Sequence, residues 1–214
     1  MSPYLYEFSK IAVAHLLAVM SPGPDFAMVL RQSLAHGRRT AVWTSVGIGS
    51  AISLHITYSL LGVGFLLKSS LLGFTLLKFA GAAYLGWTGI RALRSQPRAA
   101  AGVLDGSVHA GETAPTAGAA WWTGFLTNAL NPKATLFFVA LFPIAISPQT
   151  PKLIQAGYGL WMALSTMAWF SFVSLMLTRE KVRRAFLRRT HWIDRALGLV
   201  FIGFAVSLAF ASLR

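Results

Sequence analysis

The chain has 214 residues, of which 55% are hydrophobic and 12% are charged, and its mean hydropathy is +0.60. A soluble domain carries about twice that charged fraction, so we expect lipid to cover the long apolar tracts. A formal charge of +13 would indicate nucleic acid in a soluble protein. Here the basic residues fall in short clusters between apolar segments, which is how membrane proteins encode topology, and no nucleic-acid partner is expected. The lack of cysteine excludes disulfides and thiolate metal sites.

The first apolar segment contains "IAVAHLLAVM" after Lys10, a pattern similar to a secretory signal. A cleavage site of the A-x-A type is missing at residues 19–21, and the apolar pattern resumes after the prolines that follow. We therefore expect a membrane segment that is retained in the protein.

Six apolar runs are long enough to cross about 30 Å of hydrocarbon, which takes roughly 20 residues of helix. The sequence between the third and fourth runs, residues 95–118, is rich in Ala, Gly, Pro, Ser and Thr and predicts a flexible cytoplasmic linker. The predicted fold is therefore an all-α polytopic membrane protein with one three-helix repeat in residues 1–94 and a second in residues 119–214. The six runs lie near residues 8–30, 42–67, 71–93, 119–146, 154–177 and 193–212.

Lysine and arginine gather in alternate loops, after the first, third and fifth apolar runs. Thirteen of the nineteen basic residues lie there, and the stretch from Arg179 to Arg195 is the most basic of these loops. Because cytoplasmic loops carry the excess of Lys and Arg, both termini are predicted to face outward.

The motif "SPGPD" interrupts the first run with two prolines and a glycine. A proline inside a helix removes a backbone hydrogen bond and collides with the preceding turn, so this run is predicted to form two half-helices, Phe8 to Met20 and Pro24 to Gln32. "NPK" interrupts the fourth run at a comparable place, at Pro132. Three crossings per half give related halves opposite directions, and matching breaks in inverted repeats indicate a transporter's binding site.

An ionisable residue stands beside each break, Asp25 in the first half and Lys133 in the second. Such groups inside a bilayer cost at least about a few kcal/mol and are functional candidates by default. Unwound backbone at that depth must line a cavity or be buried in protein, and the amides that start each second half-helix suit a carboxylate. Two interpretations stay open: the two charges pair and hold the halves together, or the pocket recognises a zwitterion.

In the second interpretation Asp25 attracts an ammonium group or exchanges a proton, while Lys133 and nearby amides hold a carboxylate. His15 and His55 lie in the first and second runs and are candidates for proton coupling together with Asp25, since imidazole titrates near neutrality. A hydrogen bond to a neighbouring helix is the alternative role for each histidine. The predicted substrate-binding residues are Pro22, Gly23, Pro24, Asp25, Asn128, Asn131, Pro132 and Lys133.

Three stretches resemble, in order and spacing, the signatures of the LysE/RhtB family of amino-acid exporters: "SPGPDFAMVLRQSLAHGRRTAVWTSVGIGSAISLH", "LLKFAGAAYLGWTGIRALRS" and "GFLTNALNPKATLFFVALFPI". The resemblance covers all but the linker and implies a bacterial inner-membrane exporter driven by the proton gradient. "PGPDF" is more similar to the homoserine, threonine and leucine branch than to the branch for basic amino acids. The family's motif residues fall on Pro22, Gly23, Pro24, Asp25, Asn131, Pro132 and Lys133.

These observations together favour a secondary transporter that exports small neutral amino acids in exchange for protons, as one half of the chain rocks against the other. The expected partners are the amino acid, protons and the lipid bilayer, with no cofactor or metal, and a homo-oligomer is left open. An enzyme is disfavoured because the chain has no H-E-x-x-H, no G-x-S-x-G and no cysteine. An exporter of basic amino acids and a non-transporting membrane sensor or assembly subunit remain the alternatives.

Overall fold

The computed structural model describes residues 2–69, 71–96, 113–147, 149–176 and 180–210, and in these residues the fold is all-helical, without strands. This confirms the all-α part of the predicted fold class. The helices are α1 (Pro3–Met20), α2 (Pro24–Ala35), α3 (Arg38–Ser69), α4 (Leu71–Leu93), α5 (Ala117–Ala129), α6 (Pro132–Ala145), α7 (Lys152–Met176) and α8 (Glu180–Phe210).

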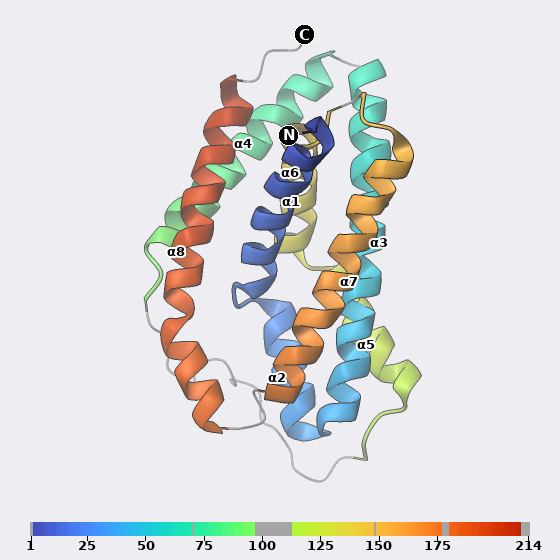
Figure 1. Ribbon diagram of the computed structural model, residues 1–214, viewed down its shortest axis with the longest axis vertical. Helices are drawn as coiled ribbons and strands as arrows, with labels where there is room; N and C mark the ends of the chain where they lie inside the picture. Colours follow the sequence, from blue (N-terminus) through green and yellow to red (C-terminus); the bar gives the residue numbers. More distant parts are fainter. Residues whose placement is uncertain (1, 70, 97–112, 148, 177–179, 211–214) are drawn as a thin grey trace.

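Length and composition identify helices that suit a membrane. Among the described residues, α7 alone is long and apolar enough to cross one, and the pairs α1–α2 and α5–α6 also qualify if each bent pair counts as one span. Helices run along the long axis of the molecule, and the start of α1 lies toward the same end as the end of α8 (Figure 1). These features fit a membrane protein.

Helices from the two predicted repeats are interleaved in the bundle. In the described residues α4 packs mainly against α8, while α3 packs mainly against α5 and α7. Both α1 and α6 contact helices of each group and lie between them (Figure 1). One half of each broken helix, α1 in the first and α6 in the second, therefore occupies the centre of the bundle.

Glycines allow the closest helix approaches. A Cβ on Gly124 of α5 would lie 1.9 Å from the carbonyl oxygen of Thr44 on α3, and one on Gly198 of α8 would lie 2.7 Å from the carbonyl oxygen of Gly89 on α4. Any larger residue would push these backbones apart, and small residues at such contacts are typical of helices in lipid. The α3–α5 and α4–α8 pairs are thus tightly joined.

Both predicted helix breaks are confirmed. The axis bends by 49° between α1 and α2, and by 56° between α5 and the Pro132–Phe142 part of α6. Pro24 and Pro132 each occupy the first position of the new helix, where the missing N–H has no helical partner to lose. We call residues 21–23 the first break and residues 130–131 the second break.

The main difference from the sequence prediction lies at the last predicted loop. The basic stretch from Arg179 to Arg195, predicted as a loop, is helical from Glu180 onward and forms the first half of α8. Apolar residues recur between its charges, and one of them, Phe186, stacks on Phe26 of α2 with ring centroids 5.6 Å apart. That contact gives the segment a packed face, which a loop would lack. Most of the predicted linker, residues 97–112, lies outside the described residues.

Candidate functional site

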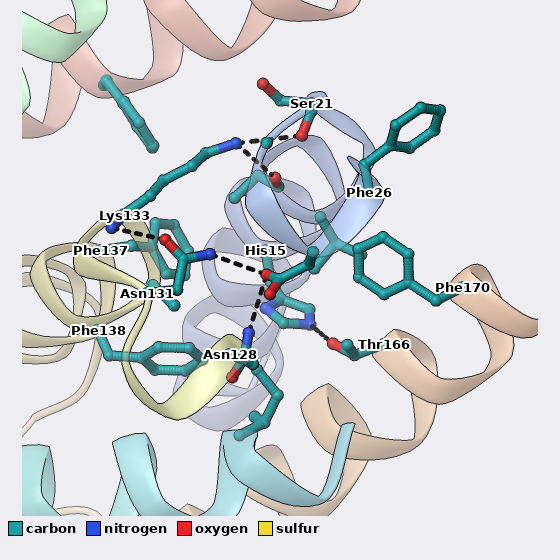
Figure 2. Close-up of a pocket in the computed structure, with 17 residues that line it drawn as sticks. His15, Ser21, Phe26, Asn128, Asn131, Lys133, Phe137, Phe138, Thr166 and Phe170 are labelled. Atoms are coloured by element: carbon teal, nitrogen blue, oxygen red, sulfur yellow. Dashed lines mark hydrogen bonds between the residues drawn. The ribbon is translucent and has the colours of Figure 1, made fainter. Parts of the chain in front are cut away.

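A cavity lies where the two breaks meet, and every described helix except α4 contributes to its wall. Its volume is about 50 Å³, several times the roughly 10–15 Å³ that one water molecule needs. Figure 2 shows the side chains that line it. The polar lining residues are His15, Ser21, Asp25, Asn128, Asn131, Lys133 and Thr166.

The Asp25 carboxylate is bound unequally at its two oxygens. It stands in the first turn of α2, where the partial positive charge of the helix start favours an anion. Oδ2 accepts a hydrogen bond from the side-chain amide of Asn128 and another from that of Asn131, both at 3.0 Å. Oδ1 is buried and has no hydrogen-bond partner. One oxygen is therefore held by the second break, and the other is an unmatched acceptor at the cavity.

The Lys133 ammonium group reaches from α6 to the end of α1. Its Nζ donates to the carbonyl oxygens of Ala18 at 3.3 Å and of Ser21 at 3.1 Å (Figure 2). In a continuous helix the Ala18 carbonyl would accept from residue 22, but Pro22 has no N–H. A cation is also favourable at a helix C-terminus. Lys133 thus supplies the donor that Pro22 removes.

The second break is completed partly by its own residues. The Asn131 side chain caps α6 by accepting from the Lys133 backbone N–H at 3.0 Å. The Asn128 carbonyl would accept from residue 132 in a continuous helix, and Pro132 has no N–H. The Asn128 carbonyl accepts instead from the backbone N–H of Asn131 at 2.9 Å and from Nε2 of His55 on α3 at 3.0 Å.

The hydrogen bonds of His55 assign its tautomer. A carbonyl oxygen only accepts, so Nε2 carries the proton and Nδ1 accepts from the Tyr58 hydroxyl. Nε2 also lies 3.1 Å from the side-chain oxygen of Asn128. Tyr58, His55, Asn128 and Asp25 therefore form one continuous hydrogen-bonded chain from α3 to the first turn of α2.

The hydrogen bonds of His15, on the other side of the cavity, assign its tautomer in the same way. Its Nε2 donates to the Met162 carbonyl oxygen at 3.1 Å. Nε2 also lies 3.0 Å from the Thr166 hydroxyl oxygen, a contact that Figure 2 shows. Both partners belong to α7. Each histidine is thus hydrogen-bonded to a neighbouring helix, which is the alternative role considered for them.

The structure brings six of the ten predicted site residues to the cavity lining. The other four are Pro22, Pro24, Pro132 and His55, of which the prolines shape the breaks and the histidine contacts a lining residue. Ser21 and Thr166 line the cavity and were not predicted; Ser21 directly precedes the proline pair, whereas nothing in the sequence marks Thr166. The six are His15, Gly23, Asp25, Asn128, Asn131 and Lys133.

Aromatic rings form much of the remaining wall. Phe137 and Phe138 come from α6, and Phe170 comes from α7. His55 stacks on Phe138 with ring centroids 5.4 Å apart, so the ring contacts extend from the wall into α3. Among the described residues, the lining contains one carboxylate and is otherwise largely apolar.

A bundle of apolar helices in which two broken helices meet at a polar cavity has the architecture of a membrane transporter. Comparison with protein families defines the class more closely. The LysE type translocator model matches residues 16–212, and the chain belongs to this family. The resemblance found in the motifs is confirmed.

The chain is similar to several efflux proteins along most of its length. It is 31% identical over 208 residues to a threonine efflux protein of Salmonella typhi, covering 95% of this chain and 98% of that one. It is 37% identical over 148 residues to a homoserine/homoserine lactone efflux protein of Salmonella typhimurium, covering 69% and 68%. It is 29% identical to a leucine efflux protein of Klebsiella pneumoniae, covering 92% of each. No solved structure matches the chain.

Proposed function

We propose that the protein is a secondary transporter that exports small neutral amino acids from the bacterial cytoplasm in exchange for protons. The names of its relatives, which are threonine, homoserine and leucine efflux proteins, support amino-acid export. The observation that carries the proposal is Oδ1 of Asp25, a buried acceptor without a partner at the cavity between the two breaks.

The substrate ammonium group binds Oδ1, because Oδ2 already accepts two amide hydrogen bonds. The substrate carboxylate lies toward Lys133 and the start of α6, where the cation and the helix dipole both favour an anion. A basic amino acid would bring a second positive charge, and the described lining offers one carboxylate only. The aromatic wall suits a small neutral side chain.

The proton binds the same atom as the substrate ammonium group, Oδ1 of Asp25. A buried carboxylate is stabilised by either cation, and in this proposal Oδ1 binds one of them at a time. A substrate that leaves toward the outside is replaced by a proton, and the proton is released to the cytoplasm before the next substrate binds. Exchange follows because the two ligands exclude each other at one oxygen.

The transport cycle requires the cavity to widen, since about 50 Å³ holds a few water molecules and not an amino acid. We propose six crossings of the bacterial inner membrane, in two inverted repeats, residues 1–94 and 119–214. The cytoplasmic linker of residues 95–118 joins them, both termini face outward, and the repeats move against each other around the cavity.

Counterflow in proteoliposomes tests the function. Proteoliposomes that contain the purified protein are loaded with unlabelled amino acid. Labelled threonine, homoserine, leucine, lysine or arginine is then added outside. We expect counterflow of the neutral amino acids. With no amino acid outside, we expect efflux that an inwardly directed proton gradient accelerates. Preference for lysine or arginine would show that the substrate is basic, and binding without exchange would indicate a sensor or assembly subunit.

The absence of native cysteine makes the orientation testable by single-cysteine labelling. Ser2→Cys lies at the start of α1, and Arg39→Cys lies in the exposed first turn of α3. In intact cells an impermeant thiol reagent should label the first variant and reach the second only after permeabilisation. The reverse pattern would place the termini in the cytoplasm.

A further inference from the structure

Asp194 is a buried carboxylate outside the cavity that the sequence did not single out. It lies within α8, and its side chain is 4% exposed. A buried charge is rarely retained for stability alone, because a well-packed apolar residue stabilises as much or more. The groups that the Asp194 carboxylate binds therefore indicate its role in the protein.

The two oxygens of Asp194 bind two serines that are far apart in the sequence. Oδ1 accepts from the Ser21 hydroxyl at 2.6 Å, and Oδ2 accepts from the Ser95 hydroxyl at 2.8 Å. Ser21 belongs to the first break, and Ser95 follows the end of α4. Hydrogen bonds to a carboxylate are shorter and stronger than those between neutral groups, so α8 holds the first break firmly.

Ser21 is held from two sides. Its hydroxyl donates to Asp194, and its carbonyl oxygen accepts from Lys133 Nζ at 3.1 Å. Ser21 lines the cavity and is 8% exposed. A change in the position of Ser21 therefore moves both the cavity wall and the acceptor of the Lys133 ammonium group.

The helix that carries Asp194, α8, packs closely against α4. Gly198 lies four residues after Asp194 on α8, and a Cβ on it would approach the carbonyl oxygen of Gly89 on α4 to 2.7 Å. The Arg195 guanidinium also donates to the Ser95 carbonyl oxygen at 3.3 Å. Asp194 thus projects from a tightly joined helix pair toward backbone that the two neighbouring prolines deprive of helical hydrogen bonds.

We propose that Asp194 is a positioning residue for the substrate site, which fixes Ser21 and through it the Lys133 ammonium group. This inference rests on the proposed transport function. It assigns Asp194 an effect on substrate affinity, because its bond sets the geometry of the cavity wall. Transport steps that do not depend on this wall keep their rates.

Transport kinetics of the purified protein in proteoliposomes test the proposal, with the amino acid of the panel that the wild type exchanges fastest. We expect Ser21→Ala and Asp194→Ala each to raise KM about tenfold, the usual size of one lost hydrogen bond to a charged group. The maximal rate should stay within about threefold. The double variant should resemble Asp194→Ala, because both changes remove the same bond.

Ser95→Ala is the matched control, since it removes a serine hydroxyl from the same carboxylate and leaves the Ser21 bond in place. It should lower thermal stability as Ser21→Ala does and leave KM unchanged. Unaltered KM in Ser21→Ala, or an equal rise in Ser95→Ala, would overturn the positioning role. A wild type that exchanges none of the amino acids would overturn the proposed function and this inference with it.

Discussion

The two helix breaks use proline in the same way and are completed differently. In the first, Pro22 removes the donor of the Ala18 carbonyl and Pro24 starts the next helix; in the second, Pro132 does both. The first break has Gly23 at the cap position, which offers no side-chain cap, whereas Asn131 caps the second. The first break therefore depends on Lys133 from the other half of the chain.

This difference separates two tasks. The second break, stabilised by its own asparagine and by His55, presents amide donors from a fixed position. The first break carries the Asp25 carboxylate and is held by side chains from other helices, Lys133 on α6 and Asp194 on α8. The position of the first break therefore depends on side chains from other helices, and that of the second break mainly on its own residues. Variants of each break can test this division.

The largest effect is expected from Asp25→Asn, which removes the charge and changes the size of the side chain little. Losing a close charge pair weakens binding by about a hundredfold or more, so exchange should fall by at least that factor and lose its dependence on the pH gradient. Counterflow measures the first effect, and efflux with and without an inwardly directed proton gradient measures the second.

Glu7→Gln is the control for Asp25→Asn. Glu7 is a buried carboxylate at the other end of α1, where it accepts from the Ser147 amide at 3.0 Å and the Thr150 hydroxyl at 2.9 Å. This variant should retain exchange and its pH dependence. If the Asp25→Asn protein exchanges amino acids at the wild-type rate, the Asp25 carboxylate has no role in the mechanism.

Lys133→Met should have the next largest effect, because it leaves the Ala18 and Ser21 carbonyls without their ammonium donor. An unsatisfied buried acceptor costs about 1–3 kcal/mol, so the melting temperature should fall and exchange should drop about tenfold or more. Thermal unfolding in detergent and counterflow measure the two effects.

A second change distinguishes the donor role of Lys133 from other roles. Pro22→Ala in the Lys133→Met background restores an N–H four residues after Ala18. The double variant should be more stable than Lys133→Met alone and should show the same loss of exchange. If it is no more stable, the Ala18 carbonyl does not depend on the lysine.

A smaller effect is expected from substitutions of Asn131. Its side chain caps α6 and also donates to Asp25, and two substitutions can separate these roles. Serine also caps helices well but is too short to replace the amide that donates to Asp25. Asn131→Ser should therefore keep the melting temperature and raise KM several-fold, while Asn131→Ala should also lose about 1 kcal/mol of stability. Equal melting temperatures for the two variants would argue against the cap.

The smallest effect is expected from His55→Phe. The ring can still stack on Phe138, and the hydrogen bond to Asn128 is lost. The exchange rate should fall a few-fold without a change in its pH dependence, as Tyr58→Phe should also show. Loss of the pH dependence would transfer the proton-binding role from Asp25 to His55.

The sequence predicts the two breaks well because a proline acts on the backbone locally, whatever surrounds it. The completion of the breaks is not local. The hydrogen bonds from Lys133 to the Ala18 and Ser21 carbonyls, for example, join residues more than 110 positions apart. Asp194 was missed because its partners, Ser21 and Ser95, lie more than 90 residues away. Only the packing of α8 beside the first break brings them together.

The contact between Lys133 and Ala18 also bears on how the chain is made. The ribosome delivers the proline pair more than 100 residues before Lys133 emerges. Until then the Ala18 carbonyl has no helical donor, and in lipid an unpaired carbonyl must stay near water. The first break therefore reaches its final form late in biogenesis, once the second half has entered the membrane beside it.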